Sequence, residues 1–333
     1  MLYRPTTRWT WVFFLCLLLE SLVVMALEIA CFITFTTRLR PKADQVSASR
    51  ILHSFLSLII IGLFYRSVLA YDMLAQQNTI QIYGICVYSI VLSVLSGLQY
   101  SQFFPSTAVL SDGYAMDDYP WPIYNGTLIT IIVLSTMSCC WILPVGWKLS
   151  EEFAWVVFQK VEADIPMRSR YWTFQILISI LKFDVFFFLG FMVQAVVIQT
   201  ERADLAWRMT IVVIPLSCVL LWVTASSVRH ESRTWTLAVF ASHIALEAFF
   251  VWWFERIFSQ RSYEDFFPAR KSLALFGGLS SFLSLATIIM IYMCFKNFGK
   301  GLKPYVCGGK EARIMGERFE TSLRQEYSLV AQA

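Results

Sequence analysis

The sequence predicts an all-α protein, a polytopic bundle of about eight transmembrane helices. Of its 333 residues, 57% are hydrophobic and only 15% are charged, against about 25% charged in an ordinary soluble domain. The apolar residues are also gathered into runs of roughly 20, and a helix of that length spans the ~30 Å hydrocarbon layer of a bilayer. The lipid bilayer is therefore the first partner that the sequence predicts.

Eight apolar runs give the predicted spans in chain order. They lie at Trp9–Thr36, Ile51–Tyr71, Thr79–Tyr100, Leu128–Trp147, Trp172–Ile198, Thr210–Val228, Thr234–Phe254 and Leu273–Phe295. The first is much longer than the about 7–15 apolar residues of a signal peptide, so we expect it to remain as an anchor. The second is the weakest, because His53 and Arg66 interrupt it; seven spans would remain without it. Tryptophans at or near several ends are typical of the aromatic belt at membrane interfaces.

The spans fill residues 1–295, and the hydrophilic pieces between them are too short to bury a core of their own. One piece, 148–164, is predicted to be an interfacial amphipathic helix. Its apolar residues recur at helical spacing and its charged residues occupy the opposite face, a pattern that places a helix in the headgroup region.

Residues 296–333 are predicted to form a basic, cytosolic tail. Basic residues directly after a span either fix the topology or bind anionic headgroups. Near the end, Tyr327 and Val330 match a tyrosine-based sorting signal, so the sorting machinery is a candidate partner.

The basic residues predict that both termini are cytosolic. With eight spans, 15 Lys and Arg residues lie on the side of the termini and 10 on the other side, and cytosolic loops carry the excess of positive charge. The acidic loop 101–125 fits the lumenal side. It ends in the sequon Asn125-Gly126-Thr127, so Asn125 is a candidate glycosylation site, although it abuts the next span.

Six ionisable residues form the candidate intramembrane polar site: Glu20, Glu28, Lys182, Asp184, His243 and Glu247. A charge in the hydrocarbon layer costs a few kcal/mol or more unless it is paired or hydrated. Lys182 and Asp184 point about 200° apart on one helix, so each needs a partner from another span. Glu20 is the predicted partner of Lys182. His243 or Arg66 is the predicted partner of Asp184.

Two interpretations of these charges compete. In the first, they line a site within the bundle that binds or transports a small solute or lipid. In the second, the protein has a structural or trafficking role, and the charges only fix how the helices pack.

No enzyme is predicted, because the sequence contains no HExxH motif, no G-x-S-x-G elbow and no phosphate-binding glycine loop. The cysteines lack zinc-type spacing. We therefore expect no catalytic residue, no metal, no cofactor and no nucleic-acid partner.

Several strings together resemble one family, fungal multi-pass Golgi apparatus membrane proteins whose biochemical activity is unassigned. They are Ala26-Leu-Glu28, Gly146-Trp-Lys148, Glu152-Phe153, Ala163-Asp164, 171–175, 181–191 and 297–304, and the similarity runs to about Tyr305. Ala154 and His230 depart from the family pattern, which has glycine and a second arginine there. The resemblance implies a Golgi membrane location and a fungal origin, and it transfers no catalytic residue.

Overall fold

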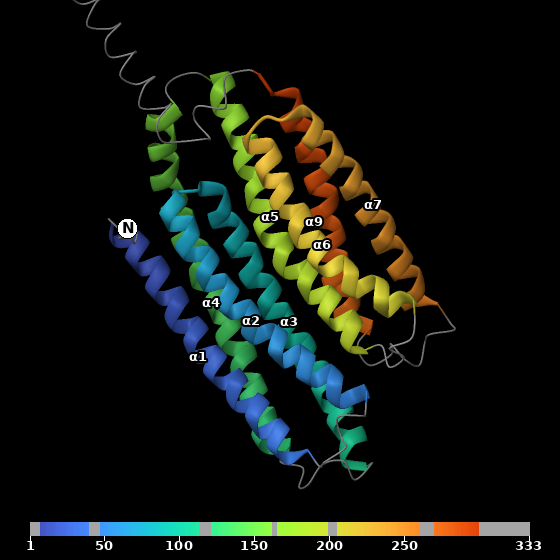
Figure 1. Ribbon diagram of the computed structural model, residues 1–333. Helices are drawn as coiled ribbons and strands as arrows, with labels where there is room; N and C mark the ends of the chain where they lie inside the picture. Colours follow the sequence, from blue (N-terminus) through green and yellow to red (C-terminus); the bar gives the residue numbers. More distant parts are fainter. Residues whose placement is uncertain are drawn as a thin grey trace, which may run out of the picture.

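The computed structural model describes residues 7–39, 47–112, 121–161, 165–198, 205–259 and 270–299. These ranges contain eight helices that are long and apolar enough to cross a membrane, which confirms the predicted all-α, eight-span fold (Figure 1). They are α1 (Arg8–Arg38), α2 (Ser47–Gln76), α3 (Thr79–Asp112), α4 (Trp121–Val161), α5 (Ile165–Ile198), α6 (Leu205–Arg229), α7 (Arg233–Phe258) and α9 (Arg270–Lys296). Helices are favoured in the hydrocarbon layer because each one hydrogen-bonds its own backbone N–H and C=O groups, which find no water there.

Successive helices run in opposite directions, so several chain connections meet at one end of the bundle (Figure 1). This end, the N-terminal end, holds the start of α1, the α2–α3 turn, the α6–α7 turn and the end of α9. The main-chain N–H of Gly299 donates to the Glu231 carboxylate over 3.1 Å. That contact fixes the end of α9 beside the α6–α7 turn.

The helices form two groups of four. In the first group, α1 contacts α2 and α4, and α3 contacts the same two helices. In the second group, α5 contacts α6 and α9, and α7 contacts the same two. The groups meet mainly where α5 packs against α2 and α3, so α5 is the central element of the protein.

An aromatic cluster fills the joint between the two groups. Phe186 and Phe187 of α5 lie 5.3 and 5.6 Å, centroid to centroid, from the ring of Tyr88 on α3, and both also contact Phe276 of α9. All four side chains are buried. The phenylalanines that follow Lys182 therefore pack against neighbouring helices.

All eight helices extend beyond the predicted spans, and α3 and α4 do so the most. α3 continues past Pro105 to Asp112, and α4 begins at Trp121. α4 also runs without a break to Val161, so 148–161 continues this helix and is not a separate one. Glu151 accepts hydrogen bonds from the Trp147 indole and the Lys148 ammonium. Contacts between residues one turn apart stabilise a helix, and these lie where the apolar run ends. Residues 162–164 and the tail from 300 lie outside the described residues.

Candidate functional site

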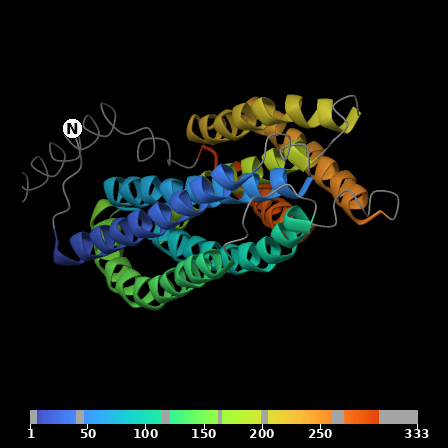
Figure 2. The ribbon, with the colours of Figure 1, turned by 90° about the horizontal axis from the view of Figure 1, so that it is seen from below.

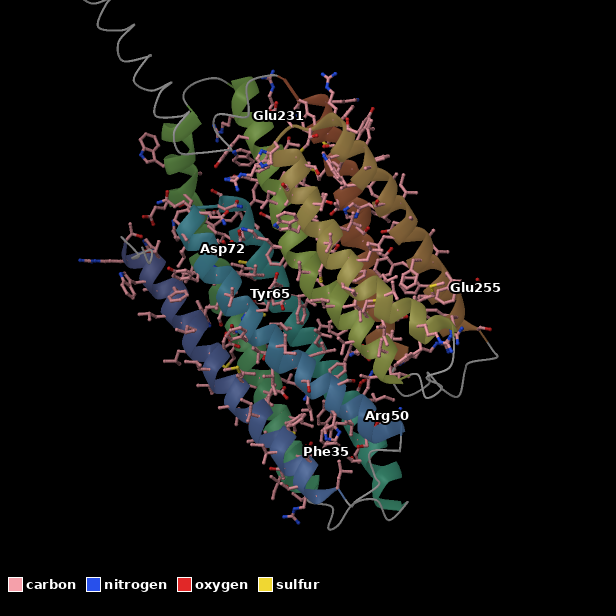
Figure 3. The ribbon with its side chains drawn as sticks, in the orientation of Figure 1. Phe35, Arg50, Tyr65, Asp72, Glu231 and Glu255 are labelled. Atoms are coloured by element: carbon pink, nitrogen blue, oxygen red, sulfur yellow. The ribbon has the colours of Figure 1, made fainter. Side chains whose placement is uncertain are left out.

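The structure distributes the six predicted site residues over separate interhelical contacts and does not gather them around one cavity. Each contact joins a different set of helices. The side-chain view in Figure 3 shows two of the residues that surround the first contact, Asp72 and Tyr65, both on α2.

Lys182 pairs with Asp72, so the predicted pairing with Glu20 is wrong. The Lys182 ammonium lies 2.5 Å from the Asp72 carboxylate and 3.2 Å from the amide oxygen of Gln81. The Gln81 amide also donates to Asp72, which closes a three-residue cluster. Asp72 lies four residues before the end of α2 and just beyond the predicted second span. The cluster therefore lies close to the α2–α3 turn, about one helical turn before the end of α2.

Glu20 pairs with Arg66 instead, which also removes Arg66 as the predicted partner of Asp184. The Arg66 guanidinium donates further to the hydroxyls of Ser21, over 2.7 Å, and Ser89, over 3.4 Å. Arg66 is only 1% exposed. Arg66, which interrupts the second predicted span, is therefore a buried charge that is paired within the first helix group.

Amide and hydroxyl groups are the partners of the remaining candidates. Glu28 accepts from the Gln99 amide, Asp184 from the Ser280 hydroxyl and Glu247 from the Ser281 hydroxyl, each over 2.9 Å. His243 contacts Thr224 over 3.1 Å. The predicted pairing of His243 with Asp184 is therefore also wrong.

A separate cavity lies away from these contacts, at the N-terminal end of the bundle. This polar cavity, of about 840 Å³, is bounded by the α2–α3 turn, α5 and α6. Its lining is mostly polar and aromatic: Gln76, Asn78, Tyr171, Phe174, Gln175, Ile178, Trp222, Ala225, Ser226, Arg229 and His230. None of these was a predicted site residue. They come from three separate elements, and none of them is a charge in the middle of an apolar run, so the sequence alone did not indicate them.

An apolar groove between α6 and α7 adjoins the polar cavity through a third, smaller cavity. A small cavity of about 380 Å³ shares Trp222, Ser226 and His230 with the polar cavity. It also shares Val223 and Trp235 with the groove, whose volume is about 500 Å³. In Figure 2, α6 and α7 diverge from the turn that joins them, which leaves room for the groove between the two helices. We call the three together the α6 site.

The two ends of the α6 site differ in chemistry. The apolar groove is lined almost wholly by aliphatic and aromatic side chains: Val213, Leu216, Ser217, Val219, Leu220, Val223, Trp235, Ala238, Val239, Ser242, Ala245, Leu246 and Phe249. The polar cavity carries the exposed Arg229 and His230. An amphipathic molecule matches this division, with its polar end beside α5 and its apolar end between α6 and α7.

The remaining predicted sites lie at the opposite end or outside the described part. Asn125 lies within α4, half-buried, and its side-chain oxygen accepts from the Tyr100 hydroxyl over 3.0 Å. The sequon is therefore helical and lies in a span. Tyr327 and Val330 lie outside the described residues.

Comparison with known proteins adds a relative of nearly the same length. The chain is 26% identical over 326 residues to a UPF0658 Golgi apparatus membrane protein of Schizosaccharomyces pombe, an alignment that covers 91% of this chain and 92% of the relative. No protein-family model matches the chain, and no solved structure matches it. The family resemblance carried by the sequence strings is thereby confirmed: the chain is a homologue of the UPF0658 Golgi apparatus membrane proteins, a multi-pass protein of the Golgi membrane.

Proposed function

We propose that this protein binds a single anionic lipid in the α6 site, without catalysing a reaction on it. The observation that carries the proposal is that the polar cavity and the apolar groove lie next to each other, on either side of a small cavity that shares Trp222 with the first and Val223 and Trp235 with the second. A lipid has the same division of polarity along its length. Its headgroup would occupy the polar cavity, and one acyl chain would lie between α6 and α7.

The lining of the polar cavity supports an anionic headgroup. Arg229 supplies a guanidinium, the group best suited to bidentate contact with a phosphate. The Tyr171 hydroxyl accepts from the Gln175 amide, so its own proton is available for a headgroup oxygen. His230 and the amide of Gln76 line the same space. Positive charge and neutral donors therefore surround one volume.

The excess of basic residues supports an orientation in which the N-terminal end faces the cytosol. The polar cavity opens at this end. In that orientation, the lipid would enter from the cytosolic leaflet, which carries the anionic lipids. A tag at either terminus should then be digested by protease in sealed Golgi vesicles, and protection of both tags would contradict the orientation.

Lipid binding is tested with the purified full-length protein in phosphatidylcholine nanodiscs. The probe is a photoactivatable phosphatidic acid, and photoactivatable phosphatidylcholine is the reference. We expect preferential labelling by the anionic probe, with labelled peptides from α6 and α7. Equal labelling by both probes, or labelling spread evenly over the lipid-facing helices, would contradict the proposal.

Two pairs of variants locate the site. Arg229→Gln should lower labelling several-fold, whereas Arg233→Gln removes the same charge four residues away, outside the α6 site, and should leave it unchanged. Ala238→Trp fills the apolar groove and should also lower labelling. Its control, Leu19→Trp, adds bulk at a lipid-facing position of α1 that is 67% exposed.

The separate charge contacts favour a second function, a structural or trafficking role. Glu20, Glu28, Lys182 and His243 each have a nearby partner on another helix, as expected of groups that fix helix packing. If the groove variants label and localise normally while charge variants fail to leave the endoplasmic reticulum, this role is favoured.

A further inference from the structure

The buried carboxylate of Asp184 and the half-buried carboxylate of Glu247 meet a row of hydroxyls where α5, α7 and α9 come together. Ser280, Ser284 and Thr287 follow one another on one face of α9, and all three are fully buried. Ser280 donates to Asp184 of α5, and the adjacent Ser281 donates to Glu247 of α7. The Ser284 hydroxyl lies beside Glu247. Oxygen atoms of α5, α7 and α9 thus come together around Ser280 and Ser281, and the hydroxyls of Ser284 and Thr287 continue the row along α9.

Positive charge is missing from this region. Within the described residues, neither Asp184 nor Glu247 forms an ion pair with a lysine or arginine. Lys182, two residues from Asp184, is directed to Asp72 and Gln81. The two carboxylates are held by adjacent residues of α9, Asp184 by Ser280 and Glu247 by Ser281. Two negative charges without a cationic partner inside a helix bundle are unfavourable. They must be neutralised, either by protons or by a bound cation.

Several oxygens here also lack a hydrogen-bond partner among the described residues. They are Oδ2 of Asp184, Oε1 of Glu247, Oγ of Ser284 and Oγ1 of Thr287. Asp184 is 0% exposed. A hydroxyl that donates its proton to a carboxylate keeps its lone pairs, so Ser280 and Ser281 add to the available oxygens. The set is rich in hard oxygen donors, the ligands that alkali and alkaline-earth cations prefer.

We propose that Asp184, Glu247 and the α9 hydroxyls bind one monovalent alkali cation. The ion would offset the charge of the carboxylates and use the oxygens that have no other partner. The site lies on α5, α7 and α9, whereas the α6 site is built on the α2–α3 turn, α5, α6 and α7, so the two proposals stand independently. Glu28 offers a contrast, because it is a single carboxylate held by one amide.

The test is thermal unfolding of the purified full-length protein in detergent. NaCl or KCl replaces choline chloride at constant ionic strength, so that only the identity of the cation changes. We expect Tm to rise saturably with Na⁺ or K⁺, by about 3–6 °C at a concentration 100 times the dissociation constant. No difference from choline would overturn the proposal and indicate that protons alone neutralise the carboxyl groups.

Three variants assign the effect to the site. Asp184→Asn should abolish the cation-dependent shift. Ser284→Ala is a milder change for use if that variant fails to fold, and it should weaken cation affinity about tenfold. Glu28→Gln removes a fully buried carboxylate elsewhere and should keep the full shift. Binding of ²²Na⁺ to the folded protein gives a second readout. A cation response that is unchanged in Asp184→Asn or in Ser284→Ala, or that is lost in Glu28→Gln, would overturn the assignment.

Discussion

Lys182 of α5 and Asp72 of α2 form an ion pair that joins the two four-helix groups, with 2.5 Å between the ammonium nitrogen and the carboxylate oxygen. The pair is partly screened, since the two side chains are 22% and 33% exposed. Gln81 of α3 holds both charges through its amide. The Tyr65 hydroxyl donates to the Lys182 carbonyl over 2.6 Å, which adds a second polar contact at the same joint.

Lys182→Met should destabilise the protein by about 1–3 kcal/mol, between the values typical of exposed and of buried pairs. The reason is that Asp72 would remain without its cation near the membrane interior. Unfolding in denaturant measures the change. Lys148→Met is the matched control, because the Lys148–Glu151 pair is more than half exposed on both sides and should contribute about 1 kcal/mol or less. Equal losses in the two variants would contradict a joining role.

Removing both partners separates the pair from its surroundings. The double variant Lys182→Met/Asp72→Leu leaves no unpaired charge, so it should be less destabilised than the sum of the two single variants. A double-mutant cycle gives the coupling energy. Additive losses would mean that the two charges act separately.

Arg66→Met should be more severe than Lys182→Met, with a loss of about 3–5 kcal/mol. Arg66 is almost completely buried, and its removal would leave Glu20 unpaired and two hydroxyls without their donor. We expect retention in the endoplasmic reticulum, measured by colocalisation with organelle markers. Arg66→Met/Glu20→Leu should restore part of the Golgi signal, and a complete failure to do so would contradict the pairing as the cause.

Asn125 should remain unglycosylated. Its sequon is helical, it lies in a span, and the Asn125 side chain is engaged by Tyr100. Oligosaccharide transfer requires a sequon that is accessible in the lumen, away from the bilayer. We expect no change in electrophoretic mobility after treatment with peptide N-glycosidase F, and the same mobility for Asn125→Gln. A shift that is present in the native protein and lost in Asn125→Gln would contradict this.

The sequence predicted the helices well because hydropathy acts along a single helix. Apolar runs located all eight spans, including the weak second one with Arg66. Which charged side chains pair with each other depends on which helices are neighbours and on how far each is shifted along the bundle axis. The sequence of a single span does not contain this information. Lys182 therefore received Glu20 as its predicted partner, and Asp72 was overlooked because it lies just past the predicted end of its span. The α6 site was missed for the same reason, since α2, α5, α6 and α7 build it together.

Gly84 of α3 lies directly against Phe183 of α5, so its substitution tests how closely the two helices pack at the aromatic cluster. A Cβ atom at this position would lie only 2.2 Å from the ring of Phe183, so Gly84→Ala should destabilise the protein by about 1–3 kcal/mol through overpacking. Gly97, also on α3, has no atom within 4 Å of the same added carbon. Gly97→Ala should therefore be neutral or stabilising by up to about 1 kcal/mol. Phe183→Leu should recover part of the loss in Gly84→Ala, because a smaller side chain relieves the overlap. If unfolding shows Gly84→Ala to be as stable as Gly97→Ala, α5 does not press against α3 as closely as the structure indicates.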